Sequence, residues 1–71
     1  MSREIRRRFG ARIRELRQER KMRQLDLAVN MDVQESYISN IETGAKEPCL
    51  EVIEKLAKGL GVSLRKIFWD L

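Results

Sequence analysis

Residues 24–43, QLDLAVNMDVQESYISNIET, decide the fold of this chain. They read as two short helices joined by a tight turn, because the apolar residues fall only where two crossed helices would touch. A small residue is needed at the closest approach, and Ala28 occupies that position. The inner faces carry Leu27, Ala28, Met31, Val33, Ile38 and Ile41. The outward side of the second helix is short and polar, which suits an element that enters the major groove of DNA.

The polar residues on that outward side are the candidate base-reading residues. Their amide, carboxylate and hydroxyl groups match the donors and acceptors of base edges, and a good bidentate pair contributes about 1–3 kcal/mol of discrimination. For each residue the alternative is an ordinary solvated position on a helix. The set is Gln34, Glu35, Ser36, Ser39 and Asn40.

Length and composition bound the class of protein. Seventy-one residues predict a single domain, residues 1–71, built around the unit 24–43. A lone cysteine argues against a disulfide framework and favours a reducing compartment, so we expect a cytoplasmic location. With no histidine and one cysteine the chain offers no zinc ligand set. No apolar run approaches the roughly 20 residues of a membrane span, and charge from Arg3 onward argues against a secretory signal.

The net charge of +4 is unevenly distributed along the chain. Residues 1–23 hold ten basic side chains, nine of them arginine, against three acidic ones, a balance of +7. Residues 24–71 hold five basic and eight acidic side chains, a balance of −3. The arginine fork matches phosphate geometry, so phosphate contact is the favoured interpretation, with a solvated helix face or a membrane-surface helix as alternatives. Arg12 and Arg14 are secondary candidates, since not every arginine here can face DNA.

Hydrophobic spacing predicts five helices and no strand, because no segment alternates with period two for long. The expected bounds are residues 3–19, 24–30, 34 or 35–43, 50–60 and 64–69. The apolar stripe of the first helix is Ile5, Phe9, Ile13 and Leu16. The later helices should turn inward Leu50, Ile53, Leu56, Ala57, Leu60, Leu64, Ile67 and Phe68. The predicted fold class is all-α, a compact five-helix bundle.

Cap residues mark the helix ends. Ser2 and Ser63 are expected N-caps, and Gly44 and Gly61 are expected to end helices, Gly44 with a left-handed backbone. Asp32 is either the turn residue of the central unit or an N-cap reaching toward the following helix.

A set of residues in fixed order and spacing resembles a known family. The set is Gln24, Leu27-Ala28, Val33, Tyr37-Ile38-Ser39, Ile41-Glu42, Gly44, Pro48, Leu56-Ala57 and Leu60-Gly61-Val62-Ser63. The chain from about Phe9 to Phe68 resembles the Cro and phage-repressor type of helix-turn-helix, the xenobiotic-response-element-like family. The resemblance implies a lambda-repressor-like DNA-binding fold and a transcriptional regulator. The small size is also similar to restriction-modification controller proteins.

The chain departs from the family pattern at three positions. Arg23 stands where the family usually has a capping Ser or Thr, and Asp26 in the first turn partly compensates through the helix dipole. Asp32 stands where the turn usually has Gly, and Gln34 stands where Ser or Thr is usual. Glu35 on the outward face suits a cytosine amino group better than a phosphate.

The candidate phosphate contacts flank the reading helix. Gln24 is similar to the family glutamine that binds the DNA backbone, and the free N–H groups of a helix N-terminus support such a site. Arg23 lies next to it, while Thr43 and Lys46 lie at the end of the reading helix and in the loop that follows. Tyr37 either supports the edge of the core or directs its hydroxyl to a phosphate. Glu42 is expected to pair with an arginine of the first helix, because a carboxylate near phosphate is repelled.

One reading helix covers few base pairs, so we expect a homodimer on a pseudo-palindromic operator in double-stranded DNA, with two helices about 34 Å apart. The candidate interface residues are Phe68, Trp69 and Leu71, with Val52, Ile53 or Leu64 nearby. The alternative is that Trp69 closes the core of the monomer.

Other functional classes have less support. The chain has no histidine, no Gly-rich phosphate loop and no paired-carboxylate pocket, so we expect no enzyme activity, no cofactor and no small-molecule ligand. Cys49 fits a half-buried helix start better than a nucleophile. The alternative function is a protein-interaction module such as an antitoxin, with DNA binding secondary.

Overall fold

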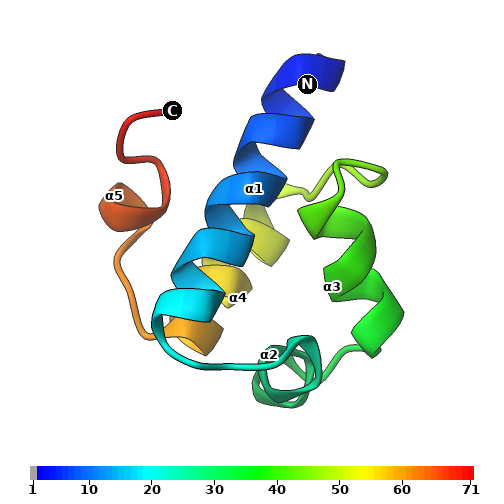
Figure 1. Cartoon of the computed structure of the whole chain (residues 1–71), viewed down its shortest axis with the longest axis vertical. Helices are drawn as coiled ribbons and strands as arrows, with labels where there is room; N and C mark the ends of the chain where they lie inside the picture. The colour runs from blue at the N-terminus through cyan, green and yellow to red at the C-terminus, as the bar shows by residue number, and fades with distance from the viewer. Residues whose placement is uncertain (1) are drawn as a thin grey trace.

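A central first helix organises the computed structural model, which describes residues 2–71 (Figure 1). Its helices are α1 (Arg3–Glu19), α2 (Gln24–Met31), α3 (Glu35–Glu42), α4 (Leu50–Leu60) and α5 (Leu64–Ile67). α1 lies between α3 on one side and α5 on the other, and α2 crosses beneath its C-terminal end (Figure 1). No strand occurs in residues 2–71, and no helix among them has the length and apolarity to cross a membrane. The predicted all-α class is confirmed.

The core is built from the residues that the periodicity selected. Phe9, Ile13 and Leu16 of α1 are at most 1% exposed, and they meet side chains from each of the other four helices. Burying one such side chain contributes about 1.5–3 kcal/mol. The other apolar residues of the core are Leu27, Ala28, Met31, Ile38, Ile41, Ile53, Leu56, Ala57, Leu60 and Ile67. Met22, Val33 and Tyr37 pack against this core while remaining partly exposed.

Two leucines predicted to face inward are instead exposed. Leu50 is 83% and Leu64 47% exposed. Each is the first residue of its helix. Helical spacing correctly assigned both leucines to the apolar side of their helices. It could not show that the buried core does not extend to the first residue of either helix.

The last helix is shorter than expected. α5 ends at Ile67, not at Trp69, because Phe68 is its C-cap and Asp70 has a left-handed backbone (φ 61°). Ile67 is fully buried, whereas Phe68 is 46% exposed and only partly turned inward. Its ring packs against Phe9 with centroids 5.7 Å apart and planes tilted by 40°.

The two predicted serine N-caps and the Gly61 C-cap are confirmed, whereas the C-cap of α3 is Thr43 and Gly44 follows it. The Ser2 hydroxyl accepts a hydrogen bond from the Ile5 N–H at 3.2 Å, and the Ser63 hydroxyl accepts from the Lys66 N–H at 3.0 Å. Gly44 and Gly61 have φ of 81° and 72°, the left-handed conformation that glycine adopts with least strain. These caps fix where α1 and α5 begin and where the chain turns after α3 and α4.

Gly10 has a role that the sequence did not reveal. A Cβ atom at this position would lie 2.3 Å from the Ile41 carbonyl oxygen and 2.6 Å from that of Glu42. Only glycine therefore allows the backbone of α1 to approach the end of α3 this closely. This contact sets the distance between α1 and α3, and with it the position of α3 relative to the rest of the bundle.

Candidate nucleic-acid interface

The turn between α2 and α3 positions the candidate reading helix. Asp32 adopts the left-handed conformation (φ 57°, ψ 47°) and ends α2. The Val33 N–H then donates to the Ala28 carbonyl at 3.0 Å, which folds the chain back over the buried Ala28. Asp32 is thus the turn residue, while Gln34 occupies the N-cap position of α3 and makes no side-chain cap hydrogen bond. α2 runs one residue further than expected, and α3 ends one residue earlier.

The five candidate base-reading residues share the solvent side of α3. Gln34, Glu35, Ser36 and Asn40 are exposed, and Ser39 is half-buried at the edge of this surface. Ile38 and Ile41, on the opposite side of the helix, are at most 1% exposed and hold α3 against the bundle. The arrangement leaves a short polar face with side chains that donate and accept hydrogen bonds.

Arg17 and Glu42 form a buried ion pair beneath this face. The Arg17 guanidinium donates from Nε to Glu42 Oε2 at 2.6 Å and from Nη2 to Oε1 at 3.0 Å. Its Nη1 donates to the Met22 carbonyl at 2.7 Å. The hydrogen bonds to Glu42 raise the pKa of Arg17 above its usual value, although burial opposes this. The expected pairing of Glu42 with an arginine of the first helix is therefore confirmed.

Gln24 extends this ion pair to α2. Its amide nitrogen donates to Glu42 Oε1 at 3.1 Å, so one carboxylate joins α1, α2 and α3. A glutamine amide has two N–H donors, so one remains available after this contact. The structure thus fixes the predicted phosphate ligand at the N-terminus of α2 relative to the reading face.

Arg23 replaces the missing cap with an ion pair. The Asp26 carboxylate accepts from the Arg23 backbone N–H at 2.7 Å, which is one half of a capping box. It also accepts from Arg23 Nη2 at 2.9 Å and Nε at 3.2 Å. These hydrogen bonds lower the pKa of Asp26 and raise that of Arg23. The sequence indicated only a dipole effect here and missed the hydrogen bonds.

The remaining phosphate candidates lie on α3 and in the loop that follows it. The Thr43 hydroxyl donates to the Asn40 carbonyl at 3.3 Å, and both residues are exposed. The ammonium of Lys46 lies 5.5 Å from the centre of the Tyr37 ring, a cation–π distance. Tyr37 is half-buried against the core, so the core-supporting role considered for it is confirmed.

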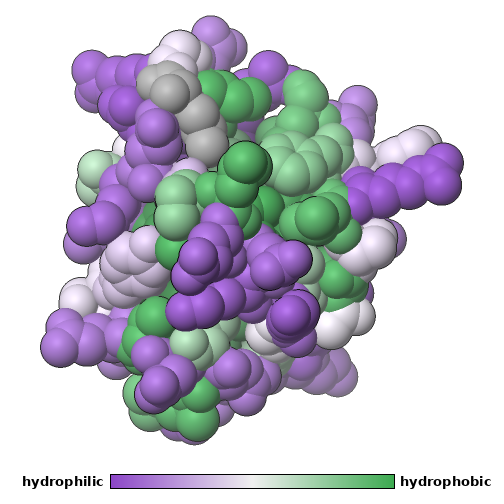
Figure 2. Space-filling model, turned by 180° about the vertical axis from the view of Figure 1, so that it is seen from behind, coloured by the Kyte–Doolittle hydropathy of each residue, from purple (hydrophilic) through white to green (hydrophobic). Residues whose placement is uncertain are grey.

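The C-terminal candidates for a dimer interface differ in exposure. Trp69 is 66% exposed and therefore does not close the monomer core. Leu71 is half-buried against the protein's own core, and its carbonyl accepts a hydrogen bond from Arg8. Ile53 is only 3% exposed, which removes it from any contact with a partner. Figure 2, a view from the opposite side of the molecule, shows hydrophobic surface interrupted by hydrophilic residues.

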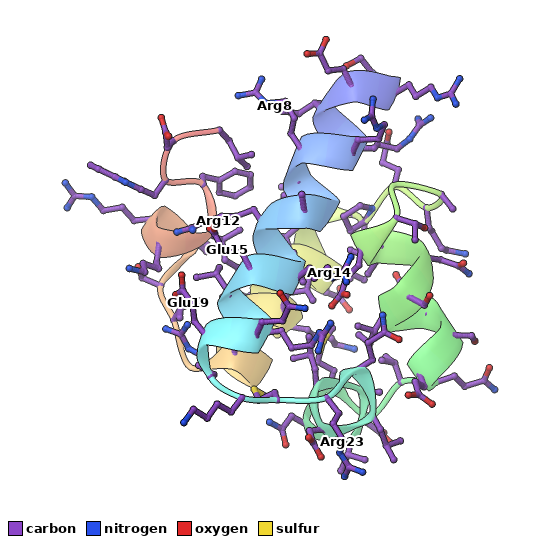
Figure 3. All side chains as sticks on the ribbon, in the orientation of Figure 1. Arg8, Arg12, Arg14, Glu15, Glu19 and Arg23 are labelled. Atoms are coloured by element: carbon purple, nitrogen blue, oxygen red, sulfur yellow. The ribbon has the colours of Figure 1, made fainter. Side chains whose placement is uncertain are left out.

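Arg12 is not available as a phosphate ligand in this structure. Its guanidinium donates to the Lys66 carbonyl at 2.8 Å and to the Glu15 carboxylate. Figure 3 shows Arg12 on the side of α1 that faces α5, whereas Arg14 lies on the side that faces α3. The two arginines considered as secondary candidates therefore have different surroundings.

Comparisons with known proteins agree with this geometry. Residues 13–67 match the family model described as Helix-turn-helix. The chain is 35% identical to control protein C.MunI of Mycoplasma sp, over 96% of this chain and 93% of that protein. It is 41% identical to control protein C.BamHI of Bacillus amyloliquefaciens, over 87% and 78% respectively.

A solved structure has the same arrangement. The restriction-modification controller protein C.AhdI from Aeromonas hydrophila superposes with a TM-score of 0.82 at 37% identity, covering 84% of this chain and 91% of that one. Sequence and structure thus agree on one family over nearly the whole chain, and its members are regulators, not enzymes. The chain belongs to the helix-turn-helix family of DNA-binding transcription regulators.

Proposed function

We propose that this regulator acts as a homodimer on a pseudo-palindromic operator and controls a restriction-modification system. The main support for this proposal is the exposed polar face of α3. Gly10 and the Arg17–Glu42 pair hold α3 in a fixed position relative to α1. The similarity to control proteins C.MunI and C.BamHI, and to the controller C.AhdI, supports the choice of circuit. Residues 1–71 act as a single DNA-binding domain in the cytoplasm.

The reading contacts come from the solvent side of α3. Gln34 and Asn40 carry amides suited to adenine, and Glu35 is an acceptor suited to the amino group of cytosine. Ser36 and Ser39 are short, so they contact bases only where the helix lies deep in the groove. Deep insertion of α3 into the groove is consistent with the small side chains of Ser36 and Ser39 on this face.

The backbone contacts flank the reading helix on both sides. At the N-terminus of α2, Gln24 keeps one free N–H donor, and Arg23 keeps Nη1 after pairing with Asp26. Thr43 and Lys46, after the C-terminus of α3, are exposed, and the ring of Tyr37, whose hydroxyl is a further candidate, lies 5.5 Å from the Lys46 ammonium. Such contacts set the register of α3 on the duplex without reading sequence.

Dimerisation uses the C-terminal segment. Phe68 and Trp69 are 46% and 66% exposed, more apolar surface than a single turn of helix needs for its own packing. Leu71 contributes the exposed part of its side chain beside them. Two copies joined here would present two α3 helices to successive major grooves.

The test is titration of the purified full chain into DNA from upstream of its own gene, read by gel shift across a range of salt. Phosphate contacts predict an affinity that falls steeply between roughly 50 and 200 mM salt. A matched duplex of scrambled sequence should bind more weakly. No shift, or a shift indifferent to salt and sequence, would contradict the proposal and favour a module that binds partner proteins, such as an antitoxin.

A further inference from the structure

Charge is segregated around the circumference of α1. Gly10 and Arg17 mark the side that touches α3, and the hydrogen bonds of Arg8 and Arg12 mark the side that touches the segment after α4. Figure 3 shows Arg8, Arg12, Glu15 and Glu19 on the α5 side and Arg14 on the α3 side. Arg7 precedes Arg14 by two turns of helix, so both lie on the same side of α1. Arg8 and Arg12 thus form a group on the α5 side of α1, while Arg7 and Arg14 lie on the other side, where Arg6 donates to the Gly44 carbonyl at 3.3 Å.

The group on the α5 side is already engaged within the protein. Arg8 donates to the Leu71 carbonyl, and Arg12 donates to the Lys66 carbonyl and pairs with Glu15. Arg20 folds back to the Leu16 carbonyl at 3.1 Å. In contrast, Arg7 and Arg14 form no ion pair or side-chain hydrogen bond with any of residues 2–71, and both are exposed.

Two open hollows beside α1 share Ala11 and Glu42 and together form a shallow groove; Arg7 and Arg8 line one hollow, and Arg14 lines the other. Arg7 lies beside Thr43 at one end of the groove, and Arg14 lies beside Gln18 and Glu42 at the other. Glu42, from α3, is neutralised by Arg17, and Glu15 and Glu19, which also belong to α1, have Arg12 and Arg20 as partners. Glu4, next to Arg7, is the remaining acidic residue on the groove. The two arginines thus leave positive charge along this edge.

The groove connects two of the proposed phosphate contacts. Thr43 lines it at the end of α3, and Glu42, which also lines it, binds the amide of Gln24 at the start of α2. A DNA strand that passes both Gln24 and Thr43 therefore runs along the edge where Arg7 and Arg14 project. Guanidinium groups suit phosphate oxygens because of their fork geometry.

We propose that Arg7 and Arg14 are additional phosphate-binding residues, which extend the DNA-backbone contact from the helix-turn-helix unit onto the first helix. This inference rests on the proposed function, because it needs α3 to lie in the groove of a duplex. The contacts are sequence-independent, so they position the protein and strengthen binding to any duplex equally. These contacts would also account for part of the excess positive charge of residues 1–23.

The test compares the wild type with the double variant Arg7→Gln, Arg14→Gln by fluorescence anisotropy on a labelled duplex of random sequence. Each lost phosphate contact should reduce the slope of log affinity against log salt by about 0.9, so the double variant loses about 1.8 per subunit. The affinity for upstream DNA and for the random duplex should fall by the same factor. Gln keeps Cβ, Cγ and Cδ of each side chain, and circular dichroism melting checks that the fold is retained.

The matched control is Lys58→Gln, which removes one charge from the exposed side of α4. It should leave the slope unchanged, whereas Arg7→Lys with Arg14→Lys should keep most of it. If the wild type binds DNA with a steep salt dependence and the double variant matches the control, this inference is wrong and the proposed function stands. If the wild type does not bind DNA, both are wrong.

Discussion

Arg17 and Glu42 lie 25 positions apart in the chain, and their side chains meet in a two-point ion pair with the shortest contact at 2.6 Å. The pair joins the helix at the centre of the bundle to the end of the candidate reading helix. Because Gln24 donates to the same carboxylate, Glu42 also holds the N-terminus of α2 in place. One glutamate thus determines how two DNA-facing elements are placed relative to each other.

Glu42→Gln should destabilise the protein by about 3–5 kcal/mol, because it leaves the Arg17 guanidinium buried without its counter-charge. Urea unfolding measures the change. Glu54→Gln, at an exposed position on α4, is the control and should stay within about 0.5 kcal/mol of the wild type. A Glu42→Gln variant as stable as this control would mean that the ion pair does not join α1 to α3 in solution.

Asp26→Asn should remove part of the acid sensitivity of folding. The Arg23 hydrogen bonds lower the folded-state pKa of Asp26 below its usual 3.8. The carboxylate therefore stabilises the fold above that value, and this contribution is lost as the pH falls through the lower folded-state pKa. The melting temperature of wild type should exceed that of Asp26→Asn at neutral pH, and the gap should narrow as the pH falls below about 3.8 and close below the folded-state pKa. A gap that stays constant with pH would contradict the assignment.

Gly10→Ala should destabilise the protein by about 1–3 kcal/mol, because the new methyl group meets backbone carbonyls that cannot move independently of α3. Alanine's higher helix propensity would by itself add up to about 1 kcal/mol of stability. Gly59→Ala is the control, since its methyl would meet side-chain atoms of Met31 and Leu27 at 2.9 and 3.0 Å, and not backbone. Thermal melting should rank Gly10→Ala below Gly59→Ala, and the reverse order would refute the close approach of α1 and α3.

Trp69→Ala should shift the protein from dimer to monomer with little loss of monomer stability, because 66% of Trp69 is exposed. Sedimentation equilibrium over a range of protein concentrations measures the shift. Leu50→Ala removes another exposed apolar side chain, at the start of α4, and should leave the dimer intact. A wild type that remains monomeric with and without upstream DNA would contradict the proposed dimer.

Most of the fold could be predicted from the sequence because local rules coincide with the tertiary contacts. The stripe of Phe9, Ile13 and Leu16 needs only helical spacing, and Ser2, Ser63 and the two turn glycines mark helix ends by their own chemistry. The pairing of Glu42 with α1 followed from charge repulsion at a DNA surface. Choosing Arg17 among the seven arginines of α1, however, required knowledge of which side of α1 faces α3.

The errors share a cause. Leu50 and Leu64 fit an apolar pattern, yet whether a helix start is covered depends on elements distant in sequence. The role of Gly10 cannot be found from its neighbours in the sequence, since the carbonyls that exclude a Cβ come from residues 41 and 42. Likewise, Arg12 and Arg14 are equivalent in the sequence, and only the position of α5 separates them. Burial by remote segments is not a local property of the chain.

Selection of bound sites from a random DNA pool, with wild type and Gln34→Ala in parallel, tests most directly whether α3 reads bases. The wild type should enrich an inverted repeat whose half-sites are about one helical turn apart. Gln34→Ala, at an exposed position, should fold normally and relax the preference at one base pair in each half-site, by about 1–3 kcal/mol. No enriched sequence with the wild type, or an identical preference in the variant, would contradict the account.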